Sequence, residues 1–193
     1  MEDTFRNKRG ITLVELLVVL ALLSMTIGVI YMYFDYGYKS WNRASAEARA
    51  VQEARLFIDV LNREVHQARV ATNGGTAVAV SAGNTQLDVY TDVSGDGRPE
   101  LVRYRLVDGR LERGVSAPQG SAYPYSYAAP TAYETVVTTV VNGAGDPLFT
   151  VDASNPPRMK VLVNLLVNDA ATPLAQPLAV QATISVRSRG NAS

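Results

Sequence analysis

The feature that most constrains this chain is an apolar segment of membrane-spanning length near its beginning. The segment runs from Ile11 to Phe34 and contains one side chain that is charged at neutral pH, the carboxylate of Glu15. A helix rises 1.5 Å per residue, so a segment of this length can cross the hydrocarbon layer of a bilayer. A carboxylate within such a segment costs free energy, and Glu15 is therefore expected to have a specific role.

The residues on either side of the segment also fit a membrane span. Basic side chains precede it and favour a cytoplasmic N-terminus, namely Arg6, Lys8 and Arg9. Aromatic side chains at its end match an outer-interface belt: Tyr31, Tyr33, Phe34, Tyr36, Tyr38 and Trp41. A secretory signal peptide is disfavoured because its apolar region has only roughly 7–15 residues. We therefore expect a single-pass membrane protein with an extracytoplasmic head.

The junction KRG-ITLVELLVVLALL around Gly10 resembles the processing site of type IV prepilins and pseudopilins. This resemblance extends from residue 6 to about residue 70. It implies that prepilin peptidase cleaves after Gly10 and methylates the new N-terminus at Ile11, although phenylalanine is usual at that position. Glu15 then occupies the fifth mature position, where the family carries its characteristic glutamate.

The resemblance also implies partners and a location. Filament assembly would move the apolar helix from the inner or cytoplasmic membrane into the core of a periplasmic or surface filament, among other pilins or pseudopilins. A carboxylate buried there needs a positive partner, which a free N-terminal amine can supply. We therefore assign the processing site to Gly10 and Ile11, and filament assembly to Glu15.

The helix is predicted to continue beyond the membrane segment. Residues 44–70 contain no glycine or proline and are rich in favourable helix formers. Apolar side chains recur there in a narrow stripe, formed by Val51, Ala54, Ile58, Leu61, Val65 and Ala68. The predicted segments are a leader at 1–10, a membrane and filament-core helix at 11–36, an amphipathic continuation at 37–71 and a β-rich head at 72–193.

The head shows the alternation of short β-strands. Residues 87–91, 102–106 and 110–115 predict a three-stranded meander, with a two-residue hairpin turn at Asp108-Gly109. Further strands are predicted at residues 136–141, 161–167 and 178–186. The expected fold is α+β, with a long helix packed on an antiparallel sheet.

The order of these elements, the GDG turn and the ending VRSRGN resemble J-type minor pseudopilins and related minor pilins. That resemblance implies a low-copy subunit of a type II secretion filament or a type IV pilus. The alternative is a single-pass membrane-anchored protein whose β head binds an extracytoplasmic ligand and which forms no filament.

Composition argues against enzymatic and nucleic-acid functions. The chain has no cysteine and one histidine, His66, so most metal sites and nucleophilic triads lack their residues. Its formal net charge is zero, and acidic residues interleave with the arginines of the meander, so a nucleic-acid surface is not expected. We expect no enzyme and no cofactor apart from the calcium ion considered next.

One loop is a candidate calcium site. Asp92, Ser94, Asp96 and Glu100 occupy oxygen-ligand positions of a calcium-binding loop. However, Arg103 stands where that loop needs a bidentate acid, and a turn rich in Asp and Gly forms without metal. A calcium site and a plain hairpin loop both remain possible from the sequence. Three alternating tyrosines in the following loop suit either a docking surface or a cover over the core: Tyr123, Tyr125 and Tyr127.

Overall fold

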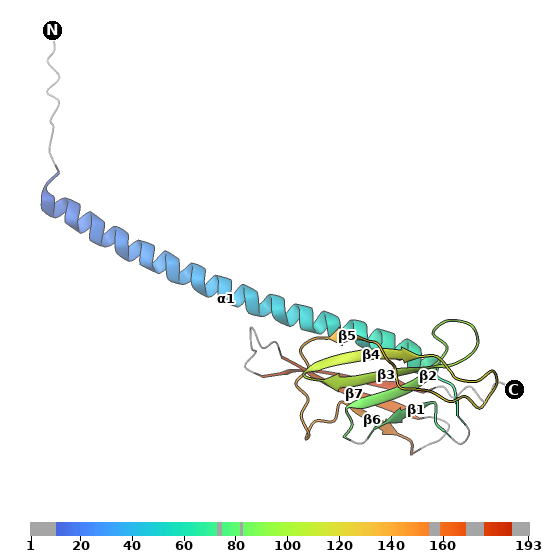
Figure 1. The fold of residues 1–193 in the computed structure, drawn as a ribbon. Coiled ribbons are helices and arrows are strands. Elements are labelled where there is room, and N and C mark those ends of the chain that lie inside the picture. Colours follow the sequence, from blue (N-terminus) through green and yellow to red (C-terminus); the bar gives the residue numbers. More distant parts are fainter. Residues whose placement is uncertain (1–10, 73–74, 82, 155–158, 169–175, 187–193) are drawn as a thin grey trace, which may run out of the picture. The chain divides into compact units, whose positions relative to one another are not determined.

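The computed structural model describes residues 11–72, 75–81, 83–154, 159–168 and 176–186. Within these residues one helix, α1 (Leu13–His66), is followed by eight strands, which confirms the predicted α+β class (Figure 1). The chain divides into two compact units, Met1–Ala44 and Ser45–Ser193. The first unit holds the apolar part of α1, and the second holds the rest of α1 with all the strands.

In the first unit the apolar side chains of α1 face outward. Every large apolar side chain that the structure describes there is exposed, from Ile11, with 75% of its surface accessible, to Trp41, with 74%. By its length and composition α1 is able to cross a membrane. An exposed apolar surface of this extent needs lipid or other apolar helices around it.

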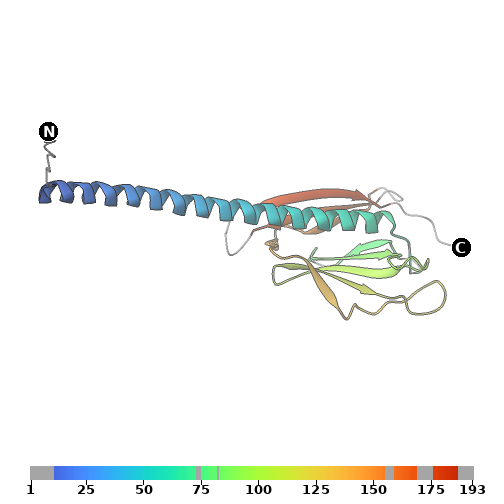
Figure 2. The same cartoon turned by 90° about the horizontal axis from the view of Figure 1, so that it is seen from above.

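In the second unit α1 packs on two antiparallel sheets. The first has the strand order β1 (Val78–Val80), β2 (Gln86–Thr91), β3 (Glu100–Val107), β4 (Arg110–Ser116) and β5 (Tyr133–Val137). The second consists of β6 (Phe149–Asp152), β7 (Lys160–Val167) and β8 (Leu178–Ser185). Seen from above, the strands of the two sheets lie on either side of the helix (Figure 2).

This arrangement explains why the buried face of α1 differs from the predicted stripe. Ala54, Leu61 and Val65 are buried as predicted, whereas Val51 and Ile58 are only half-buried. Phe57, with 2% of its surface exposed, joins the core instead. Because side chains of both sheets enter the core, α1 must bury a broader face than a narrow stripe provides.

The helix ends at His66, so the predicted continuation to residue 71 is too long. Beyond His66 the backbone pairs with other parts of the head. The Arg69 N–H donates to the Tyr90 carbonyl at 2.8 Å, and the Ala71 carbonyl accepts from the Tyr125 N–H at 3.0 Å. These non-helical hydrogen bonds replace the helical ones. The sequence Asn73-Gly74-Gly75 also predicts a helix end, and of these residues Asn73 and Gly74 lie outside the described ones.

The predicted meander is confirmed as β2, β3 and β4. Its hairpin turn pairs Val107 with Arg110 across Asp108 and Gly109. Both turn residues have positive φ, 48° and 72°, as a tight two-residue hairpin requires.

Of the later strands, the prediction at 161–167 is confirmed as β7, whereas the one at 136–141 agrees less closely. β5 occupies 133–137 rather than 136–141, because residues 138–141 pass from one sheet to the other. The Val140 N–H donates to the Gly109 carbonyl at 2.8 Å, and the Val141 N–H donates to the Leu166 carbonyl at 2.9 Å. The predicted strand at 178–186 becomes β8, with Val186 just beyond its end. Two short strands, β1 and β6, were not predicted because three or four residues carry too little alternation.

Candidate functional site

The first turn of α1 holds the carboxylate that the sequence singled out. Thr12 precedes the first helical residue, Leu13, and its side-chain oxygen accepts a hydrogen bond from the Glu15 backbone N–H at 3.2 Å. Thr12 is therefore an N-cap, and Thr-x-x-Glu is the spacing of a capping box. A carboxylate in this turn also interacts favourably with the positive end of the helix dipole.

The aliphatic hydroxyl groups of Ser24 and Thr26 in the apolar segment are satisfied locally. The Ser24 hydroxyl donates to the Ala21 carbonyl and the Thr26 hydroxyl donates to the Leu22 carbonyl, each at 2.9 Å. Such bonds to the preceding turn allow hydroxyl side chains to lie in lipid. Glu15 is thus the one charged group between residues 11 and 34.

The structure describes two of the residues assigned to processing, assembly and orientation. Ile11 and Glu15 lie at the beginning of α1, four residues apart in sequence and both in the exposed apolar unit. Gly10 lies outside the described residues, as do Arg6, Lys8 and Arg9. Their roles in processing and membrane orientation remain predictions.

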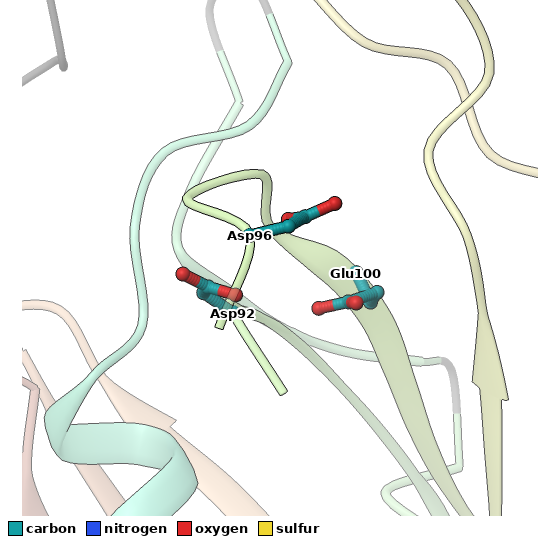
Figure 3. Close-up of side chains that lie close together, drawn as sticks. All are labelled: Asp92, Asp96 and Glu100. Atoms are coloured by element: carbon teal, nitrogen blue, oxygen red, sulfur yellow. The ribbon is translucent and has the colours of Figure 1, made fainter. Parts of the chain in front are cut away.

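The candidate calcium loop brings its three predicted carboxylate ligands together (Figure 3). Oxygen atoms of Asp92, Asp96 and Glu100 lie within 4.8 Å of one another. The backbone N–H of Ser94, the fourth predicted ligand, donates to Glu100 at 3.3 Å.

Each of these carboxylates also accepts hydrogen bonds from the loop backbone. Asp92 accepts from the N–H groups of Gly95 and Gly97 at 2.7 and 2.9 Å, and Glu100 accepts from Val93 at 2.7 Å. Asp96 accepts from the Arg98 N–H at 2.8 Å. These bonds close the turn without an ion, so the geometry fits both interpretations and calcium binding remains a prediction.

The three alternating tyrosines mainly tie their loop to the head. The Tyr127 hydroxyl donates to the Pro99 carbonyl at 2.7 Å, and its ring lies 5.1 Å from that of Tyr90. The Arg98 guanidinium lies 5.5 Å from the Tyr125 ring. Tyr123 is the most exposed of the three and packs edge-on against Tyr125. These contacts favour an internal structural role for the loop.

Arg103 and Arg105 of the meander form ion pairs with acids on neighbouring strands. Arg103 donates twice to Asp88, both at 2.8 Å, and Arg105 donates to Glu112 at 2.9 Å. Each pair spans neighbouring strands, so the charges cancel locally on that face.

The sequence did not reveal a buried charge pair between α1 and the sheet. Glu64 is 5% exposed and accepts from the Tyr104 hydroxyl at 2.6 Å. Arg113 donates to the other Glu64 oxygen through Nη2 at 2.6 Å and through Nε at 3.1 Å. Burial, and then the adjacent carboxylate, raise the pKa of the Tyr104 hydroxyl above its ordinary range. Glu64 follows Leu61 by three positions, and this helical spacing was the available signal for an inward-facing acid.

A groove with a volume of about 600 Å³ lies beside this pair, within the second unit. Its lining comes from α1, from β3, β4 and β5, and from the end of β2 with the loop that follows. The lining residues are Leu56, Phe57, Val60, Arg63, Glu64, Gln67, Thr91, Asp92, Val93, Tyr104, Arg113, Glu134 and Val136.

Comparison with known proteins identifies the N-terminal motif. Residues 5–31 match the family model described as the prokaryotic N-terminal methylation motif. No curated protein and no solved structure matches this chain. The matched residues include the predicted cleavage site, the Thr12 cap, Glu15 and most of the exposed apolar segment.

Proposed function

We propose that this chain, a type IV pilin-like protein by its N-terminal methylation motif and its fold, is a minor pilin or pseudopilin. Its role is structural and not enzymatic. The motif implies processing by prepilin peptidase and assembly with other pilins, and the apolar part of α1 is a membrane-spanning helix. The proposal also covers where the chain is cleaved, what Glu15 does in assembly, how the helix is oriented in the membrane and which class of filament subunit the chain is.

The position of Glu15 relative to the helix start carries this proposal. Cleavage after Gly10 would leave two residues, Ile11 and Thr12, before α1 begins at Leu13. The new ammonium group would then lie at the positive end of the helix dipole, where a cation is unfavourable. The ammonium group therefore favours a carboxylate partner, and Glu15, whose backbone N–H donates to the Thr12 side chain in this first turn, carries such a group.

The same carboxylate gives assembly a physical requirement. In a filament core, Glu15 is surrounded by apolar helices and is stable only beside a positive group. The N-terminal amine of a neighbouring subunit is such a group, and pairing with it fixes the axial register of the two helices. Subunits are therefore expected to leave the bilayer only when this pair can form.

We further propose insertion with the N-terminus in the cytoplasm, held by Arg6, Lys8 and Arg9, and with the head outside. The meander and hairpin that resemble J-type minor pseudopilins and related minor pilins are present as β2, β3 and β4. They support a low-copy subunit of a type II secretion filament or a type IV pilus.

N-terminal sequencing of the mature protein from its native membrane tests the processing site. We expect the sequence to begin at Ile11. Gly10→Val should leave a full-length membrane protein that does not assemble. Gly28→Val is the matched control, because no atom lies within 4 Å of a Cβ added there, and it should be processed normally. Normal cleavage of Gly10→Val would refute the assignment.

A further inference from the structure

The strand β8 is an edge of the three-stranded sheet, and its outer backbone groups have no hydrogen-bond partner among the described residues. Asn164 of β7 lies opposite Gln181 of β8, but the Asn164 N–H donates to the Leu148 carbonyl at 2.9 Å, away from β8. The backbone groups of Gln181 therefore point outward, because opposite residues of antiparallel strands alternate between bonded and unbonded pairs. The same alternation turns the backbone groups of Ala179, Thr183 and Ser185 outward.

The other sheet edges carry protection that β8 lacks. β5 carries Glu134, and the Thr138 N–H that follows it donates to Glu53 of α1 at 3.1 Å. β1 has three residues, and β6 has four and ends with Asp152. By contrast, β8 has eight residues, LAVQATIS, with no charge, proline or glycine, and its register with β7 is continuous. Natural edge strands usually carry such guards, so a long edge without them indicates a site for strand addition.

The side chains of β8 indicate what kind of strand fits there. On one face Leu178, Val180 and Ala182 are half-buried against the core. The other face is exposed and carries Gln181 and Thr183. An added strand that alternates apolar and uncharged polar side chains would cover the first face and extend the second. Because β8 carries no charge, it offers no ion-pair partner to a charged strand.

The direction of β8 argues against a second copy of this chain as the partner. Within the second unit, β8, the red strand in Figure 2, points the same way as α1. Symmetric antiparallel pairing of two β8 strands would turn one copy end for end relative to the other. Residue 45, where each second unit joins its apolar segment, would then lie at opposite ends of the pair. Two chains anchored in one bilayer need these ends on the same side.

We propose that β8 binds an extended, uncharged segment of a different protein as an additional antiparallel strand. The segment bonds through its backbone to Ala179, Gln181, Thr183 and Ser185, and its apolar side chains cover the half-buried face of β8. The inference rests on membrane anchoring of the apolar segment and not on assembly into a filament.

A synthetic peptide of Val-Thr repeats, with an uncharged polyethylene glycol chain at each end, is the probe. Its Thr side chains pair with Gln181 and Thr183, so its Thr N–H groups face β8 and its Val N–H groups face solvent. N-methylation of the Val residues should keep binding and prevents pairing between peptides. N-methylation of the Thr residues should lower the affinity by about tenfold or more, because the bonds to β8 are lost. Fluorescence anisotropy with the full chain in detergent measures both.

Thr183→Pro tests the same edge from the side of the chain. The Thr183 N–H points away from β7, so proline removes an outward donor and leaves the ladder with β7 intact. We expect about a tenfold loss of affinity for the Val-methylated peptide. Thr183→Val is the matched control, because it keeps the N–H group and the branched side chain, and it should bind normally. If the melting temperature shows that Thr183→Pro is unfolded, the two methylated peptides decide on the unsubstituted chain.

The remaining outcomes overturn strand addition by a different protein. Equal binding of the two methylated peptides would do so, since apolar adsorption to the chain or the detergent does not depend on which N–H groups are methylated. Absence of binding by either peptide would also do so. A chain that sediments as a dimer in detergent, and that Thr183→Pro makes monomeric, would identify a second copy as the occupant of the edge.

Discussion

At the scale of single residues, the pair formed by Glu64 and Arg113 joins α1 to the sheet through buried charges. The Glu64 side chain is 7% exposed and that of Arg113 is 16% exposed. Removing one partner of such a pair leaves an uncompensated charge out of contact with water. The pair is therefore costly to break, even though its net contribution to stability is small.

Arg113→Met tests this directly. We expect a loss of about 3 kcal/mol in the free energy of unfolding, because Glu64 keeps its burial and loses its positive partner. Arg110→Met is the matched control on the same strand. Arg110 is exposed, so its replacement should change stability by less than about 0.5 kcal/mol. Urea denaturation of the full chain in detergent measures both, and equal losses would contradict the prediction.

The Tyr104 hydroxyl predicts how stability changes at high pH. Burial and the Glu64 carboxylate raise the pKa of Tyr104 in the folded state above its ordinary value of 10.0. Above pH 10 the unfolded chain loses this proton while the folded chain retains it, so the free energy of unfolding falls as pH rises. The contribution of Tyr104 to the free energy of unfolding is fully present below pH 10. It is lost as the pH rises from 10 to the pKa of Tyr104 in the folded state.

Tyr104→Phe isolates this effect. Above pH 10 the unsubstituted chain should lose stability faster than the variant by about 1 kcal/mol per pH unit. Tyr127, whose pKa is also raised by burial, titrates in both proteins and cancels in the comparison. Urea denaturation curves between pH 8 and 11 measure the slopes, and parallel slopes would show that Tyr104 titrates normally.

Replacing Asp92 distinguishes a calcium site from a plain hairpin loop in the candidate calcium loop. Its carboxylate accepts two backbone N–H bonds, so Asp92→Ala should cost about 1–2 kcal/mol in a chelator, with no ion involved. We expect millimolar calcium to leave the melting temperature of the unsubstituted chain unchanged, because these bonds already close the turn. A calcium-dependent rise that Asp92→Ala abolishes would instead identify an ion site.

At the scale of elements, the packing of α1 depends on Phe57. Its ring is buried and lies 5.5 Å from that of Tyr104 in an edge-to-face contact. Phe57→Ala should cost about 3–5 kcal/mol through lost burial and the cavity left behind. The neighbouring Leu56→Ala, at an exposed position, should cost less than about 1 kcal/mol. Denaturation of the two variants compares the buried and exposed faces, and similar losses would contradict the described packing.

The same elements show what the sequence could predict. Alternation in β2, β3 and β4 and the Asp108-Gly109 turn are local signals, so the meander was predicted closely. The end of α1 depends on the hydrogen bond between Arg69 and Tyr90, which are far apart in sequence. Burial of Glu64 likewise depends on Arg113, 49 positions later. Periodicity in one segment carries no information about such distant partners.

The candidate sites also divide into those formed by residues close together in sequence and those formed by residues far apart in sequence. The processing motif is contiguous in sequence, so its local pattern is enough to indicate Gly10, Ile11 and Glu15. The groove combines side chains of α1, four strands and a loop, and no local pattern indicates it. The candidate calcium loop is intermediate in how far the local sequence predicts it. Its residues are predictable from their spacing, but the hydrogen bonds that close it depend on the path of the loop backbone.

At the scale of the whole molecule, the apolar unit has two possible environments. The exposed side chains of residues 11–41 need an apolar environment, which either lipid or the helices of other subunits supply. Under the proposed function Glu15 distinguishes these environments, because a membrane anchor gains nothing from a carboxylate, whereas pairing with an amine would fix the register of helices in a filament core. A membrane-anchored receptor with a ligand-binding head and a filament subunit therefore differ most clearly at this residue.

Glu15→Leu separates the two functions. A receptor should tolerate the change or anchor more firmly, since leucine inserts into lipid better than a carboxylate does. A filament subunit should still insert and be cleaved before Ile11, but its recovery in sheared or purified filaments should fall by at least tenfold. Glu15→Gln is the matched variant, because it keeps the polar side chain and removes the charge. If charge pairing with an N-terminal amine drives assembly, Glu15→Gln should fail as Glu15→Leu does, and full assembly of either variant would contradict the assigned role.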